Sequence, residues 1–127
     1  MASRTMALFL CLFAASCVRG ERVLHQAPPT PTPIVMWHGM GDNCCDPLTM
    51  GHLQGFIEAQ LPGVYVYSVM VGDSPAADTM HGFLGDVNAQ VEAACAALAA
   101  EPRLAAGFNA VGFSQGGQFL RAVVQRC

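Results

Sequence analysis

Hydrophobic positions along the chain form short apolar runs that are separated by stretches with helical spacing. Residues 34–37 (IVMW) are a short apolar run, which is typical of a strand buried in a parallel sheet. Residues 64–69 (VYVYSV) are rich in β-branched and aromatic side chains and predict a second strand. Residues 108–113 (FNAVGF) form the third predicted strand.

Apolar residues at spacings of three and four predict three helices. The first begins at Asp46, with Pro47 in its first turn, and ends at 62–63 (PG). The second ends near 101–102 (EP), and the third runs from 115 onward. The apolar faces are Met50, Leu53, Ile57 and Leu61 in the first helix, Val87, Val91, Cys95 and Leu98 in the second, and Phe119, Leu120, Val123, Val124 and Cys127 in the third.

Strands that alternate with helices indicate βαβ units, an α/β fold class and a mostly parallel sheet. The sheet is expected to be incomplete at its C-terminal side, so residues 34–127 are interpreted as a partial domain. Residues 27–33 (APPTPTP) predict an extended proline-rich lead-in. Residues 72–85 show no period and are predicted to form a loop.

The first residues have the pattern of a secretory signal peptide. Arg4 precedes an apolar stretch over 7–18, and small residues follow up to Gly20. Residues 1–20 are therefore the predicted signal, with an end that could extend to about 26. The stretch is about six residues too short to cross a bilayer as a helix, so a membrane anchor is the less favoured interpretation and no transmembrane segment is expected.

Composition and charge exclude several functions. The chain is 53% hydrophobic and 12% charged, which is unlike a disordered protein. Its six basic residues are all arginines and its formal net charge is -3, so a nucleic-acid partner is not expected. The histidines form no ligand cluster, and neither a metal nor a cofactor is expected; they are His25, His38, His52 and His81.

Four cysteines remain once the signal is removed, and they are Cys44, Cys45, Cys95 and Cys127. An even number in an oxidising compartment favours disulfides over metal binding. The adjacent pair could close a small ring or bind two separate partners, and the sequence alone does not decide. The other two lie on apolar faces of helices that flank one predicted strand, where a disulfide would stabilise the domain by about 4 kcal/mol in the chain-entropy model.

The candidate chemistry lies in a G-x-S-x-G pentapeptide at 112–116 (GFSQG). A predicted strand passes directly into a predicted helix there, which is the setting of the nucleophile elbow of α/β-hydrolases. Ser114 is the candidate nucleophile, and Gly112 and Gly116 would allow the strand and helix backbones to approach closely. A chance match in a glycine-bearing loop is the alternative, which the flanking elements disfavour.

An oxyanion hole in this architecture needs two N–H donors. One belongs to the residue after the nucleophile, here Gln115. The other comes from the loop after an earlier strand, and residues 38–42 (HGMGD) follow the first predicted strand, so the Met40 N–H is the candidate. A glycine turn without a catalytic part is the alternative for this loop.

A serine nucleophile also needs a base, and the base needs an orienting acid. In α/β-hydrolases both follow the serine along the chain, whereas all four histidines here precede Ser114. Unpaired histidines in such positions are usually surface or packing residues, so none is assigned as the base. We therefore expect an incomplete triad and an inactive isolated chain.

Two sequence blocks resemble the palmitoyl-protein thioesterase family. They are 37–42 (WHGMGD) with the cysteine pair after it, and 112–122 (GFSQGGQFLRA) continuing to 125–127 (QRC). The resemblance implies an α/β-hydrolase fold and a soluble lysosomal enzyme that removes thioester-linked palmitate from protein cysteines. It implies the roles given above for Ser114, Met40 and Gln115, and the disulfides Cys44–Cys45 and Cys95–Cys127.

The implied partners are S-palmitoylated proteins or peptides and fatty-acyl thioesters, without a cofactor. The family's catalytic aspartate and histidine lie beyond Cys127, so the chain is expected to be an N-terminal fragment. One alternative is a short secreted product that binds lipid or a partner and catalyses nothing. Another is an α/β-hydrolase esterase for a different acyl substrate, which would share all these residues except the two family-specific blocks.

Overall fold

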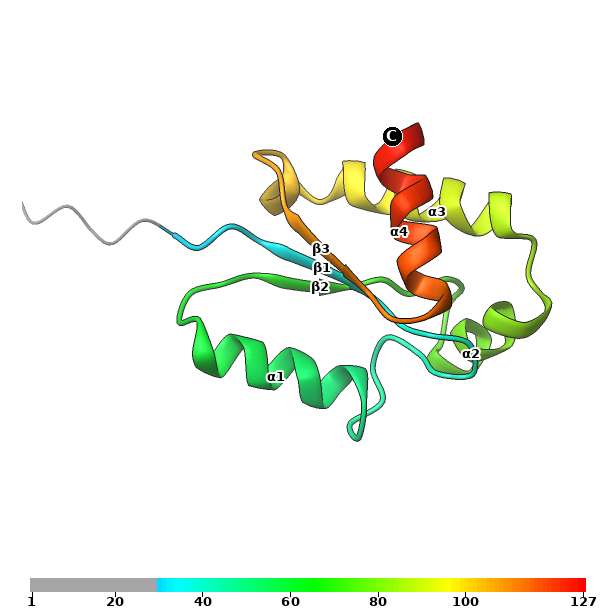
Figure 1. Cartoon of the computed structure of the whole chain (residues 1–127), viewed down its shortest axis with the longest axis horizontal. Helices are drawn as coiled ribbons and strands as arrows, with labels where there is room; N and C mark the ends of the chain where they lie inside the picture. The colour runs from blue at the N-terminus through cyan, green and yellow to red at the C-terminus, as the bar shows by residue number, and fades with distance from the viewer. Residues whose placement is uncertain (1–29) are drawn as a thin grey trace, which may run out of the picture.

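The computed structural model describes residues 30–127, which form a parallel sheet with helices on both faces (Figure 1). The strands are β1 (Ile34–Trp37), β2 (Val66–Ser68) and β3 (Asn109–Gly112), in the order β2-β1-β3. β1 pairs in parallel with both neighbours. The predicted α/β class is confirmed, and each strand lies within its predicted range.

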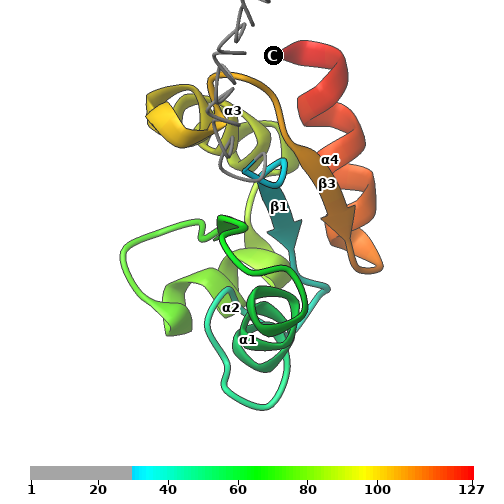
Figure 2. The ribbon, with the colours of Figure 1, turned by 90° about the vertical axis from the view of Figure 1, so that its left-hand side faces the viewer.

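Four α-helices and one short 3-10 turn connect and follow the strands in the described part of the chain. They are α1 (Met50–Gln60), α2 (Pro75–Leu84), α3 (Val87–Ala100), η1 (Pro102–Leu104) and α4 (Gln115–Arg126). Figure 2 shows α1 on one side of the sheet and α3 and α4 on the other. None of the helices within 30–127 is long and apolar enough to cross a membrane.

The central strand is buried on both faces, as a strand covered by helices on two sides must be. Val35 and Trp37 belong to the apolar cluster under α3 and α4, where the Trp37 ring meets the Phe119 ring edge-on at 5.1 Å between centroids. Met36 points to the other face and packs with Met50 in α1. Because successive side chains of β1 point to opposite faces of the sheet, the core consists of two clusters, one on each face.

The prediction of a loop at 72–85 is wrong, because most of this segment forms helix α2. Ser74 caps this helix by accepting a hydrogen bond from the Ala77 N–H at 3.2 Å, and Pro75 occupies its first turn. No apolar period was visible because the buried residues of the helix are Asp78 and Gly82. Its large apolar side chains are exposed instead, and they are Met80, Phe83 and Leu84.

Asp46 does not cap α1, which begins later, at Met50, after Thr49. The Asp46 side chain accepts a hydrogen bond from the Leu48 N–H at 2.8 Å, and its carbonyl oxygen accepts one from the Gly51 N–H at 2.8 Å. Asp46 thus stabilises the turn before the helix. Four residues expected in apolar helix faces are exposed, namely Leu61, Val87, Val124 and Cys127.

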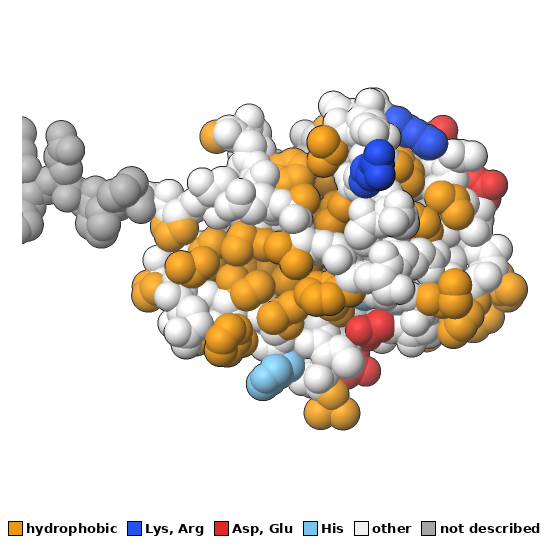
Figure 3. All heavy atoms as spheres, in the orientation of Figure 1, with side chains coloured by type: hydrophobic (Ala, Val, Ile, Leu, Met, Phe, Trp, Pro, Cys, Tyr) orange, Lys and Arg blue, Asp and Glu red, His pale blue; other side chains and the backbone are white. Residues whose placement is uncertain are grey.

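Of the two edge strands among the described residues, β2 and β3, β3 is the more exposed. All four of its residues are exposed, and Val111 and the following Phe113 present apolar side chains to solvent. Figure 3 shows apolar side chains gathered over the region of α1 and the strands, on the face turned toward the viewer. The predicted signal peptide and the first part of the lead-in lie outside the described residues.

Candidate active site

Ser114 occupies a strained turn between β3 and α4. Its φ of 50° and ψ of -116° make it the one non-glycine residue within 30–127 that has a positive φ. A side chain in this conformation costs of order 1–3 kcal/mol, and such strain is concentrated at functional sites. The turn leaves the Ser114 side chain exposed at the C-terminal end of the strand.

Gly112 and Gly116 lie where the backbones on either side of this turn come into contact. A Cβ atom on Gly112 would overlap the backbone of Gly117 at the start of α4. A Cβ atom on Gly116 would overlap the carbonyl oxygens of Trp37 and His38. Any side chain at either position would push the helix away from the strands.

The sheet register brings the loop at 38–42 beside the serine. Trp37 pairs with Gly112, so the residues that follow each strand meet at the same edge of the sheet. A Cβ atom on Gly39 would stand 3.5 Å from the Cβ of Ser114. The sequence blocks at 37–42 and 112–122 therefore form one local site.

Two backbone N–H groups in this site are unengaged within the described part of the chain. The N–H groups of Met40 and Gln115 donate to no other group of residues 30–127. Gln115 is the first residue of α4, where N–H groups have no partner inside the helix and carry partial positive charge. These are the two donors that the sequence singled out.

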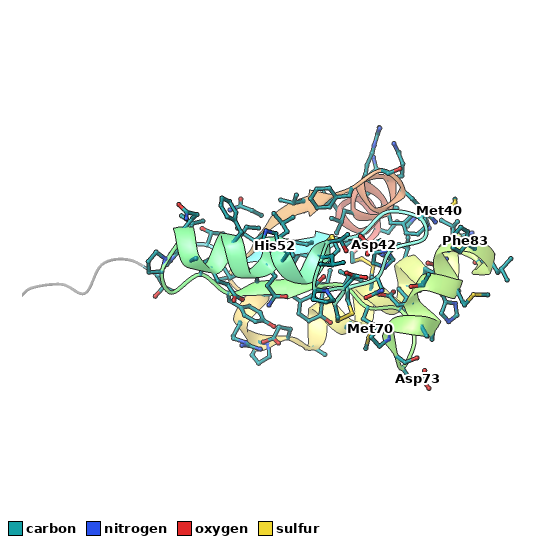
Figure 4. All side chains as sticks on the ribbon, turned by 90° about the horizontal axis from the view of Figure 1, so that it is seen from below. Met40, Asp42, His52, Met70, Asp73 and Phe83 are labelled. Atoms are coloured by element: carbon teal, nitrogen blue, oxygen red, sulfur yellow. A yellow bond between two sulfur atoms is a disulfide. The ribbon has the colours of Figure 1, made fainter. Side chains whose placement is uncertain are left out.

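Helix α2 packs against the loop at 38–42. A Cβ atom on the buried Gly82 would stand 3.7 Å from the Gly41 nitrogen and 3.8 Å from the Met40 Cα. Gly41 has a φ of +82° and faces the Phe83 ring. Figure 4 shows Met40 and Phe83 together at the end of the molecule where α2 lies. The helix that sequence analysis missed is therefore part of the site.

A buried His38–Asp78 pair joins the loop to α2. The side chains are 4% and 1% exposed, and His38 Nε2 lies 3.0 Å from Asp78 Oδ1. His38 Nδ1 donates to the Gly39 carbonyl oxygen at 2.8 Å. His38 is therefore paired, and no ring nitrogen is left to accept a proton from Ser114.

The electrostatics of this pair favour a charged imidazole. Burial lowers the pKa of His38, but the contact with Asp78, the hydrogen bond to Gly39 and the charge of Asp42 together outweigh burial. The pKa of His38 is therefore raised above its usual value. A protonated ring carries an N–H on each nitrogen, with Nδ1 beside the Gly39 oxygen and Nε2 3.0 Å from Asp78 Oδ1.

Asp78 is a buried residue beside the candidate site that sequence reasoning missed. Its Oδ2 accepts a hydrogen bond from the Cys44 N–H and its Oδ1 accepts one from the Val71 N–H, each at 2.8 Å. The available signal was the Ser-Pro pair at 74–75, which starts a helix and places this carboxylate in its first turn. Periodicity could not reveal it, because a carboxylate occupies the buried face.

Both cysteine pairs are disulfides. Cys44 and Cys45 are bonded to each other in the loop after β1, and this decides between the alternatives that the sequence left open. Cys95 in α3 is bonded to Cys127 after α4, with Cα atoms 5.8 Å apart. No group of three or more histidine, cysteine, aspartate or glutamate residues within 30–127 could hold a metal ion.

The other histidines are exposed or lie outside the described residues. His52 is exposed on α1, as Figure 4 shows, and His81 is exposed in the last turn of α2. His25 lies outside the described residues. The described chain thus brings together a strained serine, two unengaged N–H groups and a buried ion pair, but it places no free imidazole among them.

The chain is similar to several palmitoyl-protein thioesterases. The chain is 48% identical over 124 residues to palmitoyl-protein thioesterase 1 of Caenorhabditis elegans, a match that covers 98% of this chain and 40% of the relative. It is 36% identical over 96 residues to palmitoyl-protein thioesterase 3 of Dictyostelium discoideum, covering 74% of this chain and 30% of the relative. A palmitoyl-protein thioesterase–dolichyl pyrophosphate phosphatase fusion of Schizosaccharomyces pombe is 38% identical over 95 residues, covering 75% of this chain and 15% of that protein.

The chain thus spans less than half the length of these curated relatives. The family described as palmitoyl protein thioesterase matches residues 33–127, which include every strand and helix of the structure. The chain belongs to the palmitoyl protein thioesterase family.

Proposed function

We propose that this chain is the nucleophile-bearing part of a palmitoyl-protein thioesterase. The enzyme would hydrolyse thioester-linked long-chain fatty acyl groups from S-acylated cysteines of proteins. The observation that carries the proposal is the strained Ser114 between β3 and α4, in a chain of this family. Strain at a small polar residue is hard to explain by packing, since its side chain is exposed.

The proposed reaction is acyl transfer in two steps. Ser114 Oγ attacks the thioester carbonyl carbon, a base takes its proton, and the C–S bond breaks as that proton passes to the leaving sulfur. Water then attacks the acyl-serine ester, and the fatty acid leaves as the serine recovers its proton. The chemistry requires no metal or cofactor.

The N–H groups of Met40 and Gln115 are the proposed oxyanion hole. Both are unengaged within residues 30–127, and one is at the N-terminus of α4. Donors aimed at the developing oxyanion are worth a factor of about 100–1000 in kcat each. Gly112 and Gly116 would keep the serine turn tight against the loop that carries Met40.

The base and the acid are proposed to come from residues outside this chain. His38 has both ring nitrogens engaged, and His52 and His81 lie on exposed helix surfaces. Because members of a triad act as a unit, residues 1–127 by themselves should turn over at least about a thousandfold more slowly than the complete enzyme. A later aspartate and a later histidine would complete it.

The proposed substrates are S-palmitoylated proteins or peptides and other fatty-acyl thioesters, and the proposed compartment is the lysosome. The two disulfides indicate an oxidising environment such as the secretory pathway. The names of the relatives support palmitoyl-protein as the substrate class. The signal peptide predicted over 1–20 would direct entry to that pathway.

The proposal is tested with the complete protein that contains this chain. Release of palmitate is measured from an S-palmitoyl peptide and from a matched O-palmitoyl peptide, for wild type and for Ser114→Ala. We expect thioester hydrolysis that Ser114→Ala reduces at least about a thousandfold, while thermal unfolding shows that the variant is folded. Hydrolysis that survives the substitution would refute the proposal. A preference for the oxygen ester would favour a different esterase, and lipid binding without turnover would favour a non-catalytic product.

A further inference from the structure

The peptide unit between Gly39 and Met40 has its orientation fixed from one side. A planar trans peptide directs its C=O and its N–H in opposite directions, and no peptide bond within 30–127 is cis. The Gly39 oxygen accepts hydrogen bonds from His38 Nδ1 at 2.8 Å and from the Asp42 N–H at 3.2 Å. Donors on this oxygen therefore determine where the Met40 N–H points.

The His38 ring is in turn held by Asp78. The carboxylate reaches from α2 and lies 3.0 Å from Nε2, and both side chains are buried. Asp78 cannot turn away easily, because it also accepts the N–H groups of Cys44 and Val71. One carboxylate thus connects α2, the loop after β2 and the loop that carries Met40.

We propose that Asp78 and His38 are positioning residues for the oxyanion hole, with Asp78 holding the imidazole ring and the ring setting the direction of the Met40 N–H through the Gly39 oxygen. This rests on the proposed function, since the direction of that N–H matters for the reaction only if it binds the oxyanion. Neither side chain need touch the substrate, because both are buried, Nδ1 donates to the Gly39 oxygen and Nε2 lies 3.0 Å from Asp78 Oδ1.

The arrangement works fully only when both ring nitrogens carry protons. The charged groups that face the ring are Asp78 from α2 and Asp42 from the loop itself, and both favour the imidazolium. The raised pKa of His38 keeps this form populated at acidic pH. Loss of one ring proton would remove either the hydrogen bond from Nδ1 to the Gly39 oxygen or the favourable contact between Nε2 and Asp78.

Two substitutions at His38 separate these two contacts. Asn can place its amide nitrogen near the position of Nδ1, so His38→Asn keeps a donor for the Gly39 oxygen and loses the contact with Asp78. Gln can place its amide nitrogen near the position of Nε2, so His38→Gln keeps the contact with Asp78 and loses the donor for Gly39. Both remove the same charged ring, which makes each variant the structural control of the other.

Turnover of an S-palmitoyl peptide by the complete enzyme is the measurement. We expect His38→Gln to lower kcat at least about tenfold with KM nearly unchanged, because the loss concerns the transition state alone. His38→Asn keeps the donor to Gly39 and loses only the contact with Asp78, so it should lower kcat less than His38→Gln does. Asp78→Asn, which keeps the side-chain shape, should lower kcat without changing KM, and it decides the question if a His38 variant fails to fold.

Equal losses of kcat in the two His38 variants would overturn the proposal. It would also be overturned if each loss of kcat were no larger than the fraction of that variant that circular dichroism shows to be unfolded. Losses confined to KM would overturn it as well. Ser114→Ala is assayed in parallel to keep the two claims separate. If that variant still hydrolyses the thioester, the proposed function itself fails; if it is inactive while the His38 and Asp78 variants match wild type, only the positioning role fails.

Discussion

Gly39 lies directly against Ser114, with 3.5 Å between the Ser114 Cβ and the position that a Cβ on Gly39 would take. The contact follows from the pairing of Trp37 with Gly112, which brings the ends of β1 and β3 to the same level. The parallel sheet therefore places the loop and the serine turn together before any side chain of the site is considered.

Enlarging Gly39 should reduce activity more than stability. Its Cβ position is in ordinary contact with Ser114 and with the Phe113 oxygen at 3.4 Å, so Gly39→Ala should fold. Gly39→Val would extend methyl groups over the serine, and we expect kcat/KM for an S-palmitoyl peptide to fall at least about tenfold, because small displacements of reacting groups are costly. Equal activity of the glycine, alanine and valine forms would show that this contact does not border the reaction.

Gly116 should tolerate no side chain. Gly116→Ala would drive a methyl group into the carbonyl oxygens of Trp37 and His38, and we expect a loss of about 1–3 kcal/mol or more in the free energy of unfolding, measured in urea. Gly55→Ala is the matched control, since that position in α1 has nothing within 4 Å of the added Cβ. The control should stabilise by about 0.5–1 kcal/mol, as alanine does in exposed helices. A harmless Gly116→Ala would mean that the helix is not packed this closely on β1.

The stability of the protein should depend on the charge of His38. Its folded pKa is raised, so the folded state retains a proton that the unfolded chain loses near pH 6.5. This contribution is fully present below about pH 6.5 and is lost as the pH rises through the folded pKa. We expect the free energy of unfolding to decrease over that range in wild type and to decrease less in His38→Asn, which has no group to titrate there. Parallel curves for the two proteins would contradict the assignment.

The Cys95–Cys127 disulfide should be a main source of stability. It joins α3 to the end of α4. In the chain-entropy model, a cross-link that closes a loop of this length raises the free energy of unfolding by about 4 kcal/mol, because it restricts the unfolded chain. We expect the double variant Cys95→Ala/Cys127→Ala to lose roughly this amount in denaturant unfolding. The double variant Cys44→Ser/Cys45→Ser is the comparison, because a bond between adjacent residues closes hardly any loop. Similar losses in both would argue against loop closure as the cause.

The sequence predicted the sheet and the serine turn because strong local signals specify them. The apolar run at Ile34–Trp37 and the glycines around Ser114 each have a direct structural meaning, and the strands and α4 formed where the pattern indicated. Helix α2 was missed because its inner face consists of Asp78 and Gly82 rather than apolar residues.

The His38–Asp78 pair was missed for the same reason. Its two members are far apart in the sequence, and each by itself is an ordinary polar residue. Only the packing of α2 behind the loop brings them together. The boundaries of α1 also shifted, because Asp46 uses its carboxylate in a turn before the helix instead of at its cap.

The most direct test of the account is to trap the acyl-enzyme on Ser114. The complete enzyme is mixed with an S-palmitoyl peptide, quenched in acid within the first turnover and digested, and the peptide that contains Ser114 is examined by mass spectrometry. We expect a palmitoyl ester on Ser114, present in wild type and absent from Ser114→Ala. Turnover of the thioester with no acyl group on this serine, or with the acyl group on another residue, would contradict the claim that this chain carries the nucleophile.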